Sequence, residues 1–171
     1  MSAAWPEHIY EELKAADIRQ VTYVPDAGHS QLIRQCQADP AMRTVSLTTE
    51  EEGVAMLAGA WLGGQRGVLL MQSSGVGNCI NMISMQQEYR IPLLTLVTMR
   101  GEWGEFNPQQ LPMGKSTQAV LEAAGAYVYR CDDAGQVRET VRACSALAFN
   151  SSRVIAVLIG QRVIGAKNFL K

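Results

Sequence analysis

The sequence predicts a doubly wound α/β domain with a mostly parallel six-stranded sheet and helices on both faces. Short runs rich in apolar and β-branched residues alternate with helical patterns along the whole chain, and this alternation is typical of that architecture. The run at 67–71 contains no polar residue, as expected for a strand buried on both faces of a parallel sheet. One domain, residues 1–171, accounts for the whole chain and is long enough to bury its own core.

Six strands follow from these patterns, at residues 20–24, 44–48, 67–71, 92–97, 126–129 and 154–158. Helices are predicted at residues 6–16, 30–37, from 49 onward, through 80–85, at 116–124 and at 136–149. Glycines and prolines interrupt residues 98–114, so we expect a long irregular loop there, and loops of that length are often functional. Residues 163–171 are expected to form a short terminal extension.

Composition excludes several classes of function. The net charge of −1 and the charged fraction of 18% leave no basic face for nucleic acid. The four cysteines lack a Cys-x-x-Cys pair, which argues against both a zinc site and a secreted disulfide framework. No apolar run approaches about 20 residues, and no signal-peptide pattern is present. We expect a cytoplasmic protein that binds neither membrane nor a metal through its own side chains, and whose partner is a small molecule or a protein.

Polar and glycine-rich segments follow several predicted strands, at residues 25–29, 48–52, 72–78 and 98–104. The carboxyl ends of parallel strands meet at one edge of the sheet, where ligands of such folds collect. Three acids at that edge open an Ala/Gly-rich helix. Glu52 fits a capping box with Thr49, and Glu50 fits a solvated first-turn charge. Periodicity alone does not separate Glu50 from Glu51, because both precede apolar stripes.

The segment Ser-Ser-Gly-Val-Gly-Asn after the third predicted strand has two interpretations. Gly75 and Gly77 suit either a tight turn or close backbone approach to a ligand. Ser74 and Asn78 suit either a ligand or the cap of the next helix.

The order of these motifs resembles the pyrimidine-binding domain of thiamine diphosphate enzymes. The resemblance covers nearly the whole chain: a strand followed by Pro-x-x-Gly, an acid opening a helix that contains Gly-Ala-Trp, and then the Gly/Ser turn. More closely, EEGVAMLAGAWLGG, LLMQSSGVGNCIN and MRGEWGEFNPQQLPMGKST resemble the alpha subunit of sulfopyruvate decarboxylase and related phosphonopyruvate decarboxylases.

The resemblance implies thiamine diphosphate as cofactor and assigns roles to single residues. Counting back from Gly-Ala-Trp makes Glu51 the catalytic acid that hydrogen-bonds the aminopyrimidine ring, with an error of one residue left open. A desolvated carboxyl group is suited to sharing a proton with a ring nitrogen. The residues expected to line the cofactor are Glu51, Pro25, Gly28, Ser74, Gly75 and Asn78.

The same resemblance implies a partner. The diphosphate half of the cofactor and Mg²⁺ are held in this family by a Gly-Asp-Gly segment, which is absent from residues 1–171. We therefore expect an alpha subunit in a hetero-oligomer, with a beta subunit that carries the diphosphate-binding domain and holds most of the Mg²⁺ contacts.

The expected activity is decarboxylation of a small anionic 2-oxo acid, with sulfopyruvate giving sulfoacetaldehyde and carbon dioxide as the leading reaction. His29 is a candidate catalytic and substrate-binding residue, with a surface or capping role as the alternative. Arg100 and Lys115 suit the anionic head group, although Glu102 or Glu105 offers Arg100 an ordinary ion pair. Gln72 is a further candidate for the same pocket.

Phosphonopyruvate or another 2-oxo acid is the alternative substrate, because the turn Pro-Asp-Ala-Gly-His departs from the close relatives. A non-catalytic α/β ligand-binding module is the alternative function.

Overall fold

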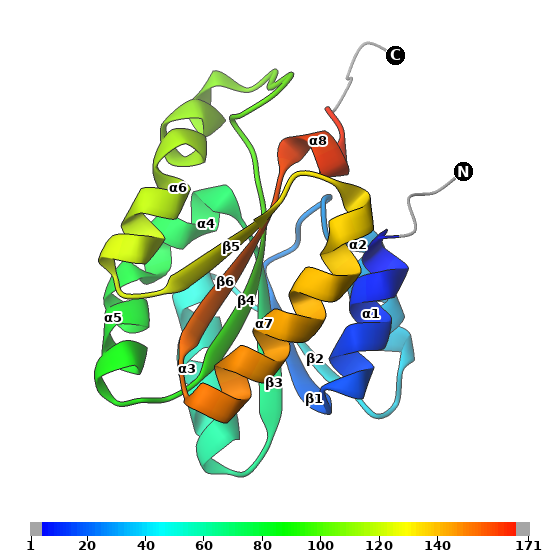
Figure 1. Cartoon of the computed structure of the whole chain (residues 1–171), viewed down its shortest axis with the longest axis vertical. Helices are drawn as coiled ribbons and strands as arrows, with labels where there is room; N and C mark the ends of the chain where they lie inside the picture. The colour runs from blue at the N-terminus through cyan, green and yellow to red at the C-terminus, as the bar shows by residue number, and fades with distance from the viewer. Residues whose placement is uncertain (1–4, 167–171) are drawn as a thin grey trace.

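The computed structural model describes residues 5–166 and confirms a six-stranded α/β fold (Figure 1). The strands are β1 (Ile18–Tyr23), β2 (Arg43–Ser46), β3 (Arg66–Gln72), β4 (Leu93–Thr98), β5 (Tyr127–Cys131) and β6 (Val154–Ile159). They form one sheet in the order β2-β1-β3-β4-β6-β5. Every pairing is parallel, so the sheet is parallel throughout.

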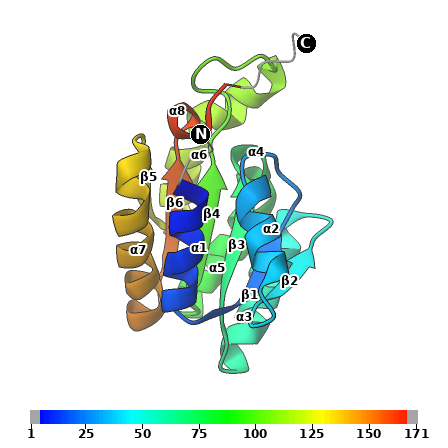
Figure 2. The same ribbon diagram turned by 90° about the vertical axis from the view of Figure 1, so that its right-hand side faces the viewer.

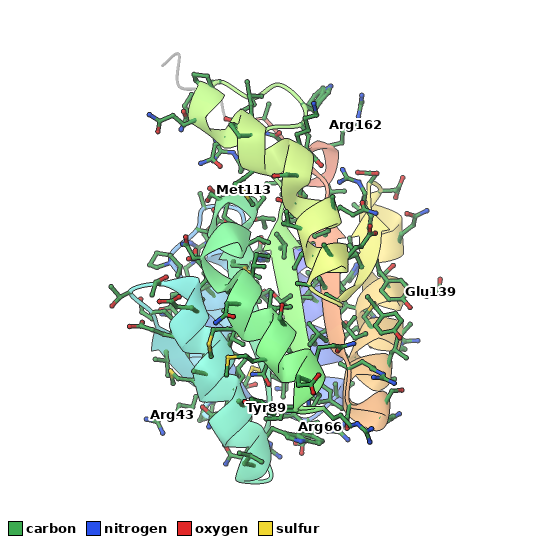
Figure 3. The ribbon with its side chains drawn as sticks, turned by 90° about the vertical axis from the view of Figure 1, so that its left-hand side faces the viewer. Arg43, Arg66, Tyr89, Met113, Glu139 and Arg162 are labelled. Atoms are coloured by element: carbon green, nitrogen blue, oxygen red, sulfur yellow. The ribbon has the colours of Figure 1, made fainter. Side chains whose placement is uncertain are left out.

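Helices cover both faces of the sheet. One face carries α1 (Trp5–Ala15), α2 (Ser30–Ala38) and α7 (Val137–Ser151), which lie side by side in Figure 2. The other carries α3 (Glu50–Leu62), α5 (Ile80–Glu88) and α6 (Leu111–Ala123), seen in Figure 3. The short helices α4 (Ser73–Val76) and α8 (Gln161–Ile164) follow β3 and β6. The start of the predicted domain and the end of its terminal extension lie outside the described residues.

Buried apolar side chains form one cluster on each face of the sheet. The centre of β3 contributes Val68 and Leu70 to one cluster and Leu69 and Met71 to the other, which explains its wholly apolar sequence. All four cysteines are buried and reduced, so they act as small core residues.

Two boundaries near the sheet's carboxyl edge differ from the prediction. The residues after β3 form helical turns, α4 and a 3-10 turn at Gly77–Cys79, and not an open turn. The predicted loop ends early, because α6 begins at Leu111 and places Pro112 in its first turn. Proline is tolerated there, since the first amides of a helix need no intrahelical acceptor.

An ion pair fixes the shortened loop between β4 and α6. The guanidinium of Arg100 donates to both carboxylate oxygens of Glu105, at 2.7 and 2.6 Å, and the Glu105 side chain is 2% exposed. Glu105 also accepts hydrogen bonds from the backbone amides of Gly101 and Asn107 and from the Gln161 side chain. These donors, Arg100 foremost, hold the pKa of Glu105 well below its usual range.

Glycines of α3 differ in the space around them, which predicts opposite effects of one substitution. A Cβ at Gly53 would lie 2.7 Å from side-chain atoms of both Leu47 and Leu69, so we expect Gly53→Ala to lower the free energy of unfolding by roughly 1–3 kcal/mol. Gly59 is exposed and has no neighbour within 4 Å, so Gly59→Ala should raise it by about 0.5–1 kcal/mol. Urea denaturation of both variants measures the difference, and equal shifts would refute this packing of α3.

Acid should weaken the ion pair between Arg100 and Glu105. Because the pKa of Glu105 is lowered on folding, its stabilisation is complete above the ordinary carboxyl range near pH ~4 and is lost as the pH falls below it. We expect Glu105→Gln to cost about 3 kcal/mol at pH 7, since it leaves the Arg100 charge buried without its anion. That deficit should shrink between pH 5 and 3, as followed by urea denaturation.

Glu102→Gln is the matched control, since Glu102 pairs with Arg130 in a more exposed position, with side chains 19% and 31% exposed. A smaller loss is expected there. A Glu105→Gln deficit that stays constant with pH would contradict the pairing.

Candidate functional site at the carboxyl edge of the sheet

The three acids that open α3 have different surroundings. Glu52 accepts hydrogen bonds from the backbone amides of Thr48 and Thr49, which confirms its predicted role in the cap. Glu51 is exposed, and the small residues that follow it, Ala55 and Gly59, are exposed as well. Glu50 is 6% exposed, so the expectation that Glu50 is solvated was wrong.

Glu50 lies against the segment that follows β3. The side-chain amide of Asn78 donates a hydrogen bond of 2.9 Å to Oε2 of Glu50. A Cβ on Gly75 would collide with the same carboxylate, so the missing side chain of Gly75 makes room for Glu50. Oε1 accepts no hydrogen bond from the described residues. The predicted alternative that Asn78 caps the following helix is wrong, because no side chain caps α5.

A second carboxylate occupies the turn after β1. Oδ1 of Asp26 accepts a 2.8 Å hydrogen bond from Gln72, and Oδ2 accepts one of 2.6 Å from Thr98. Gln72 and Thr98 are paired at the ends of β3 and β4, so Asp26 bridges three strand ends. Burial opposes ionisation, but nearby His29 and these hydrogen bonds outweigh it and lower the pKa of Asp26.

The other residues predicted at this edge lie in or near the same turn. Gly28 packs where a Cβ would lie 2.8 Å from both Asp26 and Thr98, and Ser74 donates to the carbonyl oxygen of the Gln72 side chain. Pro25 is exposed and lines, with Asp26, a hollow of about 400 Å³ beside the turn. Gly77 is exposed, and a Cβ there would lie 3.6 Å from the sulfur of Met113.

His29 is buried beneath this turn with 1% of its surface exposed. Its Nε2 lies 3.0 Å from the carbonyl oxygen of Leu96, so Nε2 carries the proton, and Nδ1 has no hydrogen-bond partner among the described residues. Burial lowers the pKa of His29, partly offset by Asp26. The surface alternative for His29 is therefore wrong, while its contact with substrate stays a prediction.

The two predicted anion-binding cations are placed differently. Nε and Nη2 of Arg100 both donate to Glu105, which confirms the ion-pair alternative considered for Arg100. Glu102 pairs with Arg130 and not with Arg100. Lys115 lies within α6, exposed, and forms no ion pair with the described residues.

The structure thus brings Glu50, Gly75 and Asn78 together, and Asp26 together with Gln72 and Thr98. Sequence reasoning did not predict that Glu50 is buried or that Asp26 bridges these strand ends. The signals were present, since Glu50 precedes the buried Val54 and Leu57 of its own helix and Asp26 directly follows a strand and a proline.

A carboxylate with one oxygen held and the other unbonded fits a partner that shares a proton with it. The aminopyrimidine ring of thiamine diphosphate offers such a ring nitrogen. The described residues contain no cluster of three metal-ligating side chains, and none of their helices is long and apolar enough to cross a membrane.

Known proteins resemble this chain in sequence. Residues 5–112 match the family described as thiamine pyrophosphate enzyme, N-terminal TPP binding domain. The chain is 33% identical over 154 residues to the sulfopyruvate decarboxylase subunit alpha of Methanothermobacter thermautotrophicus, covering 90% of this chain and 93% of that one. It is 32% identical over 154 residues to the subunit of the same name from Methanococcus maripaludis, covering 90% and 92%.

Longer proteins match in part. Phosphonopyruvate decarboxylase of Streptomyces viridochromogenes is 38% identical over 112 residues, which span 64% of this chain and 28% of that protein. Among solved structures, the 2-oxoglutarate:ferredoxin oxidoreductase of Magnetococcus marinus superposes with a TM-score of 0.73 over 94% of this chain and 29% of that one, at 12% identity. That likeness concerns the fold alone. The match over residues 5–112 and the full-length relatives together show that this chain belongs to the thiamine pyrophosphate enzyme family, alongside the alpha subunits of sulfopyruvate decarboxylase.

Proposed function

We propose that this chain is the alpha subunit of a thiamine diphosphate-dependent decarboxylase that acts on a small anionic 2-oxo acid. Sulfopyruvate is the leading substrate, because the relatives that match over nine-tenths of the chain carry that name. The observation that carries the proposal is the buried Glu50 carboxylate, which packs against Gly75 with one oxygen held by Asn78 and the other without a hydrogen bond from the described residues.

Glu50 takes the role predicted for Glu51. The capping of α3 by Glu52 fixes the start of the helix, and Asn78 fixes Oε2, so Oε1 is left to share a proton with a ring nitrogen of the cofactor. When bound, thiamine diphosphate accepts the electron pair that the departing carbon dioxide leaves behind. The chain's own contribution is to orient that ring, hold the proton at Oε1 and exclude water.

The remaining assignments rest on the same edge of the sheet. Lys115, exposed and unpaired within residues 5–166, is the better candidate for the anionic head group, because Arg100 is already engaged by Glu105. Asp26, hydrogen-bonded to Gln72 and Thr98, lies at the same edge of the sheet. A beta subunit would supply the diphosphate site and Mg²⁺, since residues 1–171 lack a Gly-Asp-Gly segment. Buried reduced cysteines support a cytoplasmic location.

The experiment is reconstitution with the candidate beta subunit, thiamine diphosphate and Mg²⁺, followed by assays of carbon dioxide release from a panel of 2-oxo acids. We expect sulfopyruvate to give the highest kcat/KM, with phosphonopyruvate and pyruvate as comparison substrates. A higher kcat/KM for phosphonopyruvate would identify the enzyme as a phosphonopyruvate decarboxylase. Failure of every 2-oxo acid would favour a non-catalytic ligand-binding module.

Substitution separates the two acids within the reconstituted enzyme. Glu50→Gln keeps the size of the side chain and its contact with Asn78, but it removes the proton-sharing group, so kcat should fall by about 10²–10⁴-fold. Glu51→Gln changes an exposed side chain and should retain nearly full activity. Circular dichroism should show both variants folded, and a loss confined to Glu51→Gln would return the catalytic role to Glu51.

A further inference from the structure

Arginines gather at the edge of the sheet opposite Glu50. Arg66 is the first residue of β3, Arg153 directly precedes β6, and Arg90 lies in the turn before β4. These three strands are neighbours at the centre of a parallel sheet, so their starts share its amino edge. Figure 3 shows Arg66 at the end of the molecule away from Met113 and Arg162.

These three arginines lack the carboxylate partners that most other arginines of the chain have. Within residues 5–166, none of them forms an ion pair, whereas Arg100 and Arg130 do. Arg66 donates one hydrogen bond of 3.1 Å to the carbonyl oxygen of Ala16, and its guanidinium lies 5.2 Å from the ring centre of Phe149. Positive charge therefore accumulates at this edge in a chain whose net charge is −1.

Two adjoining hollows open beside these residues and share Asn150 in their linings. The smaller, about 260 Å³, is lined by Glu12, Ala15, Ala16, Arg66, Arg142, Ser145, Ala146 and Asn150. The larger, about 460 Å³, is lined by Arg90, Asn150, Ser151, Ser152 and Arg153. The lining is thus rich in hydrogen-bond donors.

Glu12, the acid in these linings, already has a hydrogen-bond donor at each carboxylate oxygen. Both carboxylate oxygens of Glu12 accept hydrogen bonds from Arg142, at 2.9 and 2.8 Å. Glu12 is 6% exposed, and the Arg142 hydrogen bond lowers its pKa. The hollows therefore offer a ligand positive charge and hydrogen-bond donors.

Ser145 supplies an independent sign of a missing partner. Its side chain is 2% exposed, and its hydroxyl has no hydrogen-bond partner in the described part of the chain. Buried polar groups without partners are rare, because burial removes the hydrogen bonds that they make with water. Ser145 is one of the residues that line the smaller hollow.

We propose that the amino edge of the sheet is a second ligand site, which binds a small organic phosphate between Arg66 and Arg153. Guanidinium groups match the geometry of phosphate oxygens and remain charged at any physiological pH. The hollows are large enough for a ligand with two anionic groups, one in each. Because the parallel sheet separates this edge from Glu50, the site is distinct from the one proposed for the cofactor.

Isothermal titration calorimetry of the full chain tests this site without any thiamine compound or partner, using inorganic phosphate and pyrophosphate at constant ionic strength. We expect saturable binding of one anion per chain, tighter for pyrophosphate. Arg66→Ala and Arg153→Ala should each weaken pyrophosphate binding at least about tenfold, the loss of one charge-assisted hydrogen bond. Arg34→Ala is the control, because Arg34 is exposed on α2 and forms no ion pair with the described residues.

Arg153→Ala carries most weight, since Arg66→Ala also removes a hydrogen bond to Ala16 that supports the fold. The titration should extend to a pyrophosphate concentration about 100-fold above that of the protein. The proposal is overturned if the wild-type chain, at micromolar concentration, shows no saturable binding of pyrophosphate. It is equally overturned if Arg34→Ala weakens binding as much as Arg153→Ala does, because the attraction is then a general effect of charge.

Discussion

A carboxylate buried at a domain's edge must be compensated, and the compensation of Glu50 comes from the segment after β3. Asn78 supplies a hydrogen bond to one oxygen, and Gly75 supplies the space. Both depend on α4 and the 3-10 turn that follows it, since these turns carry the glycine past the carboxylate and bring the amide back to it. The first turn of α3 and the end of β3 therefore form one unit, although more than twenty residues separate them in sequence.

The parallel sheet gives this unit its neighbours. Because every strand runs in the same direction, the turns after β1, β3 and β4 meet at one edge, and Asp26 ties them together through Gln72 and Thr98. The Arg100–Glu105 pair then anchors the loop that leaves the same edge. The opposite edge collects arginines for the same topological reason. One sheet thus separates two chemically different ends, one with the buried Glu50 and one with guanidinium groups that form no ion pair within residues 5–166.

Sequence patterns were sufficient for the architecture, because the six strands are short, apolar and separated by helical periodicities. They were insufficient where tertiary contacts decide. Glu50 and Glu51 both precede apolar stripes, and burial of Glu50 follows from Asn78 and Gly75, which no local pattern reveals. Pro112 and Gly114 look like helix breakers, yet α6 starts before them, because proline fits its first turn and Gly114 packs against the Arg100 backbone. For Arg100 the sequence left open a role in substrate binding or an ion pair with Glu102 or Glu105, and the structure shows Glu105 as the partner.

The central claim is that Glu50, held by Asn78, is the acid that meets the cofactor ring. A crystal structure of the chain with its beta subunit and thiamine diphosphate tests it most directly. The account predicts a Glu50 carboxylate oxygen about 2.6–3.2 Å from a pyrimidine ring nitrogen, with the Asn78 amide still bonded to the other oxygen. A structure in which Glu51 occupies that position, while Glu50 remains buried away from the ring, would contradict it.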